Sequence, residues 1–278
     1  MLSISDHRRD SAGMKYIYPV ISRRAGGVSV GINLNVNNAC NWACLYCQVE
    51  NLSRGGPPPV DVALLEKELN AFLKDALHGD FMRRHVPEEA QRLVDIAFSG
   101  NGEPTSAPEF PLIVERLGKI LEAHDLRGQI LVRVITNGSL LYRPAVQQAM
   151  AGIAELSGEV WFKVDRGDAA GMVEINETAL DPLRVHQNLS LCADLVPTWV
   201  QTCWFELDGV PPSEAVVEAY CELLKPLANK LRGIHLYGLA RPSMQPAASR
   251  LSRLTAEALG NYAALIEKKT GIRVVTSP

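Results

Sequence analysis

The sequence predicts an α/β protein with a partial, open-sided parallel (β/α)6 barrel, an architecture like part of a TIM barrel. Short runs rich in β-branched residues alternate with amphipathic helical segments, which is typical of βα units around a parallel sheet. These runs recur at fairly even intervals, and there are too few of them for a closed eight-stranded barrel. The strand candidates are residues 28–36, 94–98, 130–135, 160–164, 199–207 and 234–239, with a seventh candidate at 272–275.

The segments between the strands carry apolar residues at helical spacing. They are residues 62–77, 110–123, 145–156, 180–195, 213–224 and 256–268. Pro111 falls in the first turn of its segment, where a missing N–H costs little. No linker-like stretch interrupts the pattern, so we expect one domain in 278 residues, with an N-terminal arm (1–27), a barrel core (28–240) and a C-terminal extension (241–278).

Composition and charge narrow the functional classes. A hydrophobic content of 47% and a net charge of −3 indicate a globular chain without an overall basic bias for nucleic acid. The N-terminus has no apolar targeting segment, and no run approaches the ~18 apolar residues of a membrane helix, so we expect a cytoplasmic protein without a membrane partner. In that compartment cysteines stay thiols or metal ligands. The basic doublets Arg23-Arg24 and Arg83-Arg84 are interpreted as solvated surface.

Three of the six cysteines fall within eight residues, in the run Cys40-Asn41-Trp42-Ala43-Cys44-Leu45-Tyr46-Cys47. Three thiolates can hold three corners of a cubane iron–sulfur cluster and leave the fourth iron open for a small molecule. Two alternatives remain at this point. The spacing i, i+4, i+7 also fits a buried helix face, and His78 or His85 could complete a zinc site, although without a spacing signature. Because Asn37-Asn38 reads as a strand-to-loop exit, the cluster is favoured over the helix face.

Glycines and polar residues gather where the second, third and fourth predicted strands end. They are Gly100, Gly102 and Glu103 after the second, Asn137 after the third, and Lys163 and Asp165 at the end of the fourth. Glycines let the backbone approach a ligand closely, and a carboxylate can accept from an ammonium or hydroxyl group. Since parallel strands of a barrel end at one face, these residues are expected to form one site with the cysteines.

On these residues the chain resembles the radical S-adenosylmethionine superfamily. The cysteine run matches the three-cysteine motif of that family, with an aromatic residue one position before the last cysteine. The run Ser99-Gly100-Asn101-Gly102-Glu103-Pro104-Thr105 is similar to its Gly-Gly-Glu-Pro loop, with Asn101 in place of the second glycine. The resemblance covers residues 18–242. Within the superfamily the chain looks closest to iron–sulfur oxidoreductases related to the wyosine-base tRNA synthases, from residues 19–24, 31–34, 98–105, 135–142 and 236–242.

The resemblance implies a cofactor set and a reaction. Cys40, Cys44 and Cys47 would ligate a [4Fe–4S] cluster whose open iron chelates S-adenosylmethionine (AdoMet). A one-electron reductant such as flavodoxin or ferredoxin would reduce the cluster. AdoMet would then be cleaved to methionine and a 5′-deoxyadenosyl radical, which abstracts hydrogen from an unidentified small molecule, protein or RNA. The protein's share would be to position the substrate and exclude water and oxygen.

The same resemblance implies contacts to AdoMet. The residues are Tyr46, Gly100, Gly102, Glu103, Asn137, Lys163, Asp165 and Tyr237. Glu103 and the glycine backbone would hold the ammonium group, and Asn137 would reach the ribose or the carboxylate. Lys163 would meet the carboxylate and Asp165 a ribose hydroxyl, unless either belongs to a structural ion pair. Tyr46 would lie against the adenine or else pack under the cluster, and Tyr237 would flank the adenine.

Other functions stay open at the level of the sequence. They are a glycyl-radical activase acting on a partner protein, a tRNA-base-modifying enzyme, and a cluster-binding sensor without catalysis. The tRNA chemistry is disfavoured because no cysteine precedes Cys40 and the chain is not basic. Cys192, Cys203 and Cys221 are too widely spaced to indicate an auxiliary cluster and are expected to be buried thiols. Arg241-Pro242 could meet an anionic substrate group or be part of an ordinary loop.

Overall fold

The computed structural model describes residues 13–22 and 26–277. Its main feature is an eight-stranded sheet curled into an open barrel, with strand order β1-β2-β5-β6-β7-β8-β10-β12. β1 pairs antiparallel with β2, and every later neighbour in the sheet is parallel. The strands are β1 Ile17–Ser22, β2 Gly27–Ile32, β5 Leu93–Phe98, β6 Leu131–Thr136, β7 Glu159–Lys163, β8 Thr198–Cys203, β10 Gly233–Tyr237 and β12 Val274–Ser277.

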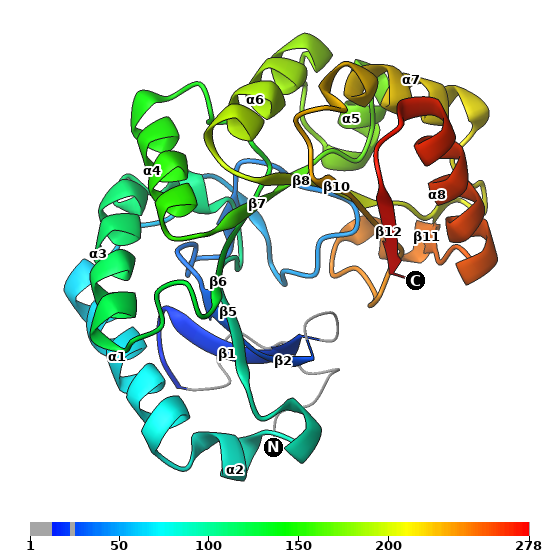
Figure 1. Cartoon of the computed structure of the whole chain (residues 1–278). Coiled ribbons are helices and arrows are strands. Elements are labelled where there is room, and N and C mark those ends of the chain that lie inside the picture. Colours follow the sequence, from blue (N-terminus) through cyan, green and yellow to red (C-terminus); the bar gives the residue numbers. More distant parts are fainter. Residues whose placement is uncertain (1–12, 23–25, 278) are drawn as a thin grey trace.

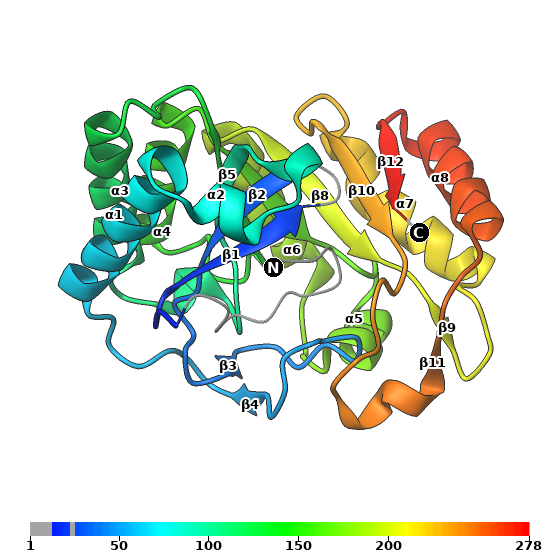
Figure 2. The same cartoon turned by 90° about the horizontal axis from the view of Figure 1, so that it is seen from below.

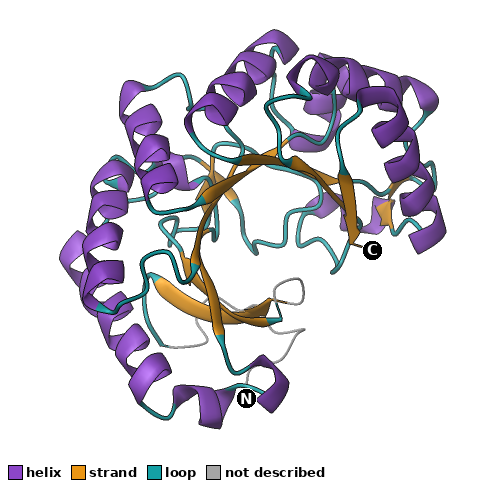
Figure 3. Cartoon of the chain, in the orientation of Figure 1, coloured by secondary structure: helices purple, strands orange, loops and turns teal. Residues whose placement is uncertain are grey.

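Helices form an outer layer around the convex face of the sheet, as Figure 3 shows. The main ones are α1 Val62–His78, α3 Phe110–Ala123, α4 Pro144–Glu155, α6 Pro182–Leu195, α7 Glu214–Leu224 and α8 Ala256–Thr270. Several begin at recognisable caps: the side chains of Asp61, Ser213 and Thr255 accept backbone N–H groups of the first turns of α1, α7 and α8. Proline occupies the first turn of α3, α4 and α6. These local signals explain why the predicted helix bounds agree closely with the structure.

Smaller elements lie at the ends of the barrel. They are α2 Phe81–His85, α5 Ala169–Asn176, the 3-10 turns η1 Glu88–Ala90, η2 Pro104–Ser106, η3 Lys225–Leu227 and η4 Pro246–Arg250, and the short strand pairs β3 Ala39–Cys40 with β4 Ser53–Arg54 and β9 Glu206–Leu207 with β11 Leu251–Ser252. Figure 2 shows that β3, β4, α5 and β11 lie at one end of the barrel. None of the helices in the described part of the chain has the length and apolarity needed to cross a membrane.

The predicted fold class is confirmed, and the seventh strand candidate is present as β12, with corrections at the edges. β1 was not predicted. It is a short edge strand that pairs only with β2, and an edge strand tolerates Pro19. The same proline weakens the strand pattern in the sequence. The first predicted strand ends at Ile32 instead of residue 36, and the fifth divides into β8 and β9. The early end of β2 releases the polar residues Asn33 and Asn35 at the carboxyl end of the strand, whereas β8 is followed by the buried Trp204 and Phe205. The sequence also gave no indication of α5.

The two faces of the sheet differ in chemistry. On β5, the side chains of Ile96 and Phe98 belong to the large apolar core under the helices, whereas Ala97 lines a cavity on the inner face. This alternation follows from the two-residue period of a strand. A second, smaller apolar cluster lies at the carboxyl end of the barrel around the cysteine run and includes Trp42, Leu45 and Phe205. The inner face is therefore open to a ligand while the outer face holds the fold together.

Candidate functional site at the carboxyl ends of the strands

The cysteine run is a loop that lines the cavity. Cys40 ends the short strand β3, and residues 41–47 contain turns and no helix, so the buried helix face considered for this spacing is wrong. Cys44 is buried, Cys40 and Cys47 are half-buried, and all three line one cavity of about 460 Å³. Within residues 13–22 and 26–277, no group of three or more His, Cys, Asp or Glu side chains converges on a single metal ion, so a zinc site with His78 or His85 finds no support. Cubane ligands bind different irons and need not converge in that way.

Two distant segments hold the cysteine loop in place. From α5, the carbonyls of Ile175 and Asn176 accept the backbone N–H groups of Leu45 (2.9 Å) and Ala43 (3.2 Å). From the loop after β10, Ser243 Oγ donates to the Leu45 carbonyl (2.6 Å) and Gln245 Nε2 to the Val49 carbonyl (2.7 Å). These bonds satisfy backbone groups that an irregular buried loop would otherwise leave unpaired. Sequence reasoning missed these residues because no local pattern marks them.

The sulfur atoms also have specific partners. Asn176 Nδ2 lies 3.2 Å from Cys44 Sγ, and the backbone N–H of Trp42 lies 3.5 Å from Cys40 Sγ. Burial raises the pKa of Cys44 to about 12 and also raises the pKa of Cys40. Metal binding requires thiolates, so ligation would have to displace these protons. N–H groups directed at sulfur, as here, stabilise negative charge on a thiolate.

The loop after β5 packs directly on the cysteine segment. A Cβ atom at Gly100, whose φ is +145°, would lie 2.3 Å from Asn33 Oδ1, and one at Gly102 would lie 2.2 Å from the Ala39 carbonyl oxygen. Asn33 Oδ1 also accepts the Asn101 backbone N–H at 3.0 Å. The two glycines therefore allow close approach of two protein loops, in addition to lining the cavity.

Glu103 is buried at the cavity wall and held by four hydrogen bonds. Oε1 accepts from the backbone N–H and hydroxyl of Thr105 (3.1 and 2.6 Å) and from the Thr136 hydroxyl (2.6 Å). Among the residues that the structure describes, Oε2 accepts one bond, from the backbone N–H of Asn137 (2.6 Å). Burial raises the pKa of the Glu103 carboxyl above its ordinary value, and these donors partly offset that rise. Oε2 keeps acceptor capacity for a donor in the cavity.

Asn137 joins the cysteine loop to the end of β6. Its Nδ2 donates to Asn41 Oδ1 (2.8 Å), and its Oδ1 accepts from the Ser139 hydroxyl (2.7 Å), which in turn accepts from Asn41 Nδ2 (2.8 Å). Asn41 and Ser139 are positioning residues that sequence reasoning did not single out. The only signal was the place of Asn41 directly after Cys40. This closed group of three side chains fixes the orientation of Asn137 toward the cavity that it lines.

Lys163 ends β7 and Asp165 follows two residues later, and the two side chains have different surroundings. The Lys163 ammonium lines the cavity and lies 4.7 Å from the centre of the Tyr46 ring. Asp165 is buried behind the wall: Oδ2 accepts from the Tyr46 hydroxyl (2.6 Å) and Asn176 Nδ2 (2.8 Å), and Oδ1 accepts from the Cys203 backbone N–H (2.9 Å). These contacts favour a structural role for Asp165, which aligns Tyr46 and Asn176. Burial disfavours the charged form of Lys163, but neighbouring acidic groups, Tyr237 first, outweigh it and raise its pKa.

The structure thus brings together most of the residues predicted for the site. All except Asp165 line the same cavity: Cys40, Cys44, Cys47, Tyr46, Gly100, Gly102, Glu103, Asn137, Lys163 and Tyr237. Arg241 lies on the same wall and donates to Gln48 Oε1 at 3.3 Å. Cys192, Cys203 and Cys221 are buried thiols, as predicted. Burial raises the pKa of Cys192 to about 12 and that of Cys221 to about 11.

Comparison with known proteins shows which solved structures share this fold. No protein-family model matches the chain. The UPF0026 protein of Helicobacter pylori is 29% identical over 137 residues, which is 48% of this chain and only 37% of that relative. Among solved structures, a radical SAM methyltransferase from Sphaerobacter thermophilus covers 93% of this chain and is itself covered to 68%, with a TM-score of 0.61 and 15% identity. The structure of native anSMEcpe with bound AdoMet and a peptide covers 89%, is covered to 62%, and has a TM-score of 0.54 and 17% identity.

At 15% and 17% sequence identity, the similarity to these solved structures establishes the fold alone. The chain has the partial-barrel fold of radical SAM enzymes, and the resemblance predicted from the cysteine and glycine motifs is confirmed at that level. The closer link to wyosine-base tRNA synthases remains a prediction, as does the division into arm, core and extension.

Proposed function

We propose that this chain is a radical SAM enzyme that binds a [4Fe–4S] cluster through Cys40, Cys44 and Cys47 and holds AdoMet in the adjoining cavity. The observation that carries this proposal is the convergence of three cysteines and the glycine-rich Glu103 loop on one cavity at the carboxyl ends of the strands. The donor set fits: three soft thiolates, with an amide N–H directed at one sulfur, suit a cluster with an open iron. When bound, the reduced cluster supplies one electron that cleaves AdoMet to methionine and a 5′-deoxyadenosyl radical.

The chain's own residues would then bind and orient AdoMet. Oε2 of Glu103 has acceptor capacity left for the methionyl ammonium, and the Lys163 ammonium can meet the carboxylate. Asn137 Nδ2 donates one N–H to Asn41, and its other N–H, which bonds to none of the described residues, can meet a ribose or carboxylate oxygen. Tyr46 and Tyr237 line the cavity as aromatic surfaces for the adenine. The substrate, the reductant such as flavodoxin or ferredoxin, and the cytoplasmic location remain predictions.

Anaerobic reconstitution with iron and sulfide, followed by an assay for 5′-deoxyadenosine with AdoMet and dithionite, tests the proposal. We expect a four-iron cluster and slow formation of 5′-deoxyadenosine without added substrate. A protein that binds the cluster but releases no 5′-deoxyadenosine, alone or with cell extract, would support the sensor function and contradict the enzyme. Dependence of the product on a partner protein that acquires a glycyl radical would instead identify an activase.

Replacing Glu103 by glutamine is expected to leave the cluster in place and to weaken AdoMet binding. Loss of a charge-assisted hydrogen bond of about 1.5–3 kcal/mol corresponds to roughly 10- to 150-fold in Kd. Isothermal titration of reconstituted protein with AdoMet measures the change. Glu109→Gln is the matched control, because Glu109 precedes α3 outside the cavity lining. Equal affinity in Glu103→Gln and Glu109→Gln would contradict the ammonium assignment.

Replacing Asn176 by leucine is expected to make the cluster harder to reduce. The Asn176 amide N–H points at Cys44 Sγ from 3.2 Å, and such bonds favour the more negative, reduced cluster. A bond of about 1 kcal/mol corresponds to roughly 40 mV for one electron, so the midpoint potential should fall by tens of millivolts. An EPR-monitored redox titration measures it. Asn188→Leu serves as control, since that buried amide donates to the Gly138 carbonyl and not to sulfur; an unchanged potential in Asn176→Leu would refute the contact's role.

A further inference from the structure

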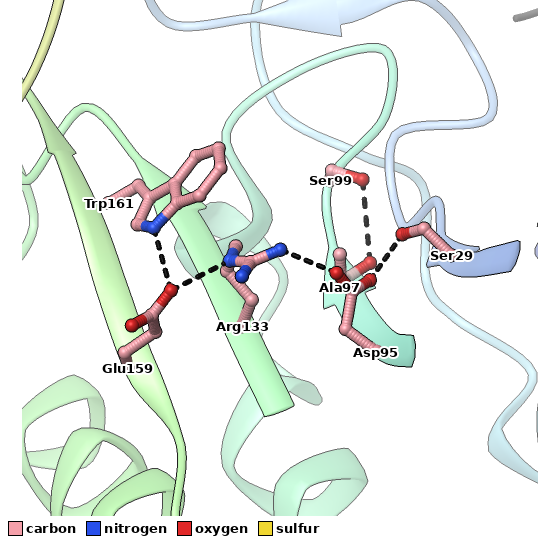
Figure 4. Close-up of polar contacts among 7 residues, drawn as sticks. All are labelled: Ser29, Asp95, Ala97, Ser99, Arg133, Glu159 and Trp161. Carbon is pink, nitrogen blue, oxygen red and sulfur yellow. Dashed lines mark hydrogen bonds and ion pairs between the residues drawn. The ribbon is translucent and has the colours of Figure 1, made fainter. Parts of the chain in front are cut away.

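The inner face of the barrel carries a polar network away from the AdoMet contacts proposed above. Figure 4 shows it: Arg133 lies between Asp95 and Glu159, Ser29 donates to Asp95, and Trp161 donates to Glu159. Arg133 Nη1 donates to Asp95 Oδ2 at 2.5 Å, and Nε donates to Glu159 Oε1 at 3.0 Å. The guanidinium carbon lies 4.1 Å from the centre of the Trp161 ring. Arg133 and Trp161 nevertheless line the same cavity as the cysteines.

The two carboxylates orient the Arg133 guanidinium and cancel its positive charge. Two carboxylates against one guanidinium give a formal charge of −1, so a further anion gains little here. The second terminal nitrogen of Arg133, Nη2, hydrogen-bonds to none of the residues that the structure describes, although Arg133 lines the cavity. Arg133 therefore offers an oriented N–H group to an uncharged acceptor.

Gln201 on β8 is the second unusual feature of this wall. It is only 8% exposed and lines the cavity. Within the described ranges, its side-chain carboxamide makes no hydrogen bond. Gln201 is the register partner of Lys163 on β7, so it stands beside the residue assigned to the AdoMet carboxylate. Its amide atoms are not among the fully buried ones that lack a partner, so they keep contact with the cavity, where a ligand can supply the missing bonds.

We propose that Arg133, Trp161 and Gln201, which we call the inner-face site, bind an uncharged, planar carboxamide or lactam group of a small-molecule substrate. This inference rests on the proposed radical SAM function, because it places the substrate next to AdoMet. A carboxamide can accept from Gln201 Nε2 and donate to Gln201 Oε1. Arg133, whose register partner Glu159 lies four residues before Lys163 on β7, offers Nη2 to a different uncharged acceptor of the same substrate. Trp161 contributes an apolar wall. At Arg133 a carboxylate or phosphate is disfavoured because Asp95 and Glu159 already neutralise the guanidinium, and Lys163 beside Gln201 is assigned to the carboxylate of AdoMet.

Benzamide and benzoate are suitable probes, since they share a shape and differ in charge. The cavity of about 460 Å³ is large enough for either probe, because an apolar cavity of about 150 Å³ can already hold a benzene ring. With the full chain carrying Lys163→Met, which removes the ammonium beside Gln201 that would attract benzoate, saturation-transfer NMR is expected to detect benzamide and much weaker binding of benzoate. Gln201→Leu should weaken benzamide binding by at least about 5-fold, because it removes both amide bonds. Benzoate binding as strong as benzamide, or undiminished benzamide binding to Gln201→Leu, would overturn the proposal.

Thermal stability provides an independent readout. Gln201→Leu removes an amide that bonds to no described residue and puts an apolar group of similar size in its place, so it is expected not to lower Tm. The matched control is Gln147→Leu in α4, where the amide donates to the Leu141 carbonyl at 3.0 Å; this change should lower Tm and leave benzamide binding unchanged. A fall in Tm for Gln201→Leu would show that the amide supports the fold and would overturn the proposal. These measurements need no cluster or AdoMet, so their outcome is independent of success or failure in the 5′-deoxyadenosine assay.

Discussion

Replacing Cys44 by alanine is expected to abolish both the iron–sulfur cluster and the formation of 5′-deoxyadenosine. Cys44 is the middle cysteine of the run, and its sulfur receives the Asn176 amide N–H and lies in the apolar cluster beside Phe205. With only Cys40 and Cys47 left in the loop, two corners of a cubane would lack protein ligands. Iron and sulfide content, visible absorbance and the 5′-deoxyadenosine assay after anaerobic reconstitution measure the loss.

Cys221→Ala is the control for this prediction. Cys221 is buried in α7, apart from the cavity lining, and should be dispensable for the cluster. We expect that variant to keep the full iron content and product formation. If Cys44→Ala retained a four-iron cluster, or if Cys221→Ala lost it, the ligand assignment would be wrong.

The largest effect on stability is expected for Arg133→Met. Arg133 is the shared partner of Asp95 and Glu159, whose side chains are 2% and 17% exposed. Removing the guanidinium leaves two facing carboxylates in a poorly hydrated interior, and breaking a buried ion pair in this way typically costs about 3–5 kcal/mol. Urea unfolding followed by circular dichroism measures the free energy of unfolding.

Two variants separate charge from packing in this prediction. Adding Asp95→Asn and Glu159→Gln to Arg133→Met removes the facing charges and should restore much of the lost stability. Arg116→Met breaks only the exposed pair with Glu66, at 3.5 Å, and is expected to cost less than about 1 kcal/mol. An Arg133→Met variant as stable as Arg116→Met would contradict the structural role of the network.

Local patterns were sufficient to predict much of the fold. The segment 110–123 forms α3 with the predicted bounds, because its proline at the first turn and its apolar spacing are local signals. The predicted strand 94–98 is β5 with one added residue for a similar reason. β1 and α5 were missed. β1 contains Pro19 and pairs on one side only, and α5 is short and largely apolar rather than clearly two-sided.

The residues of the site also fall into those that local motifs predict and those that they do not. The three cysteines, the glycine loop and Glu103 were identified from sequence because each is a compact motif. Asn176, Ser243 and Gln245 were not, since they reach the cysteine loop from 132 to 198 residues away. Asp165 also illustrates the limit: its place beside Lys163 suggested a ligand contact, while its three protein donors are visible only after folding.

By itself, the sequence determined the alternation of strands and helices and the presence of a three-cysteine motif, because both depend on residues near one another in the chain. Only the tertiary structure decided that Asp165 faces the protein, that Arg133 is balanced by two carboxylates, and that Gln201 faces the cavity without a partner among the described residues. The physical reason is that hydrogen bonding and desolvation in a barrel are set by side chains from different strands, whose register and curvature no local pattern encodes.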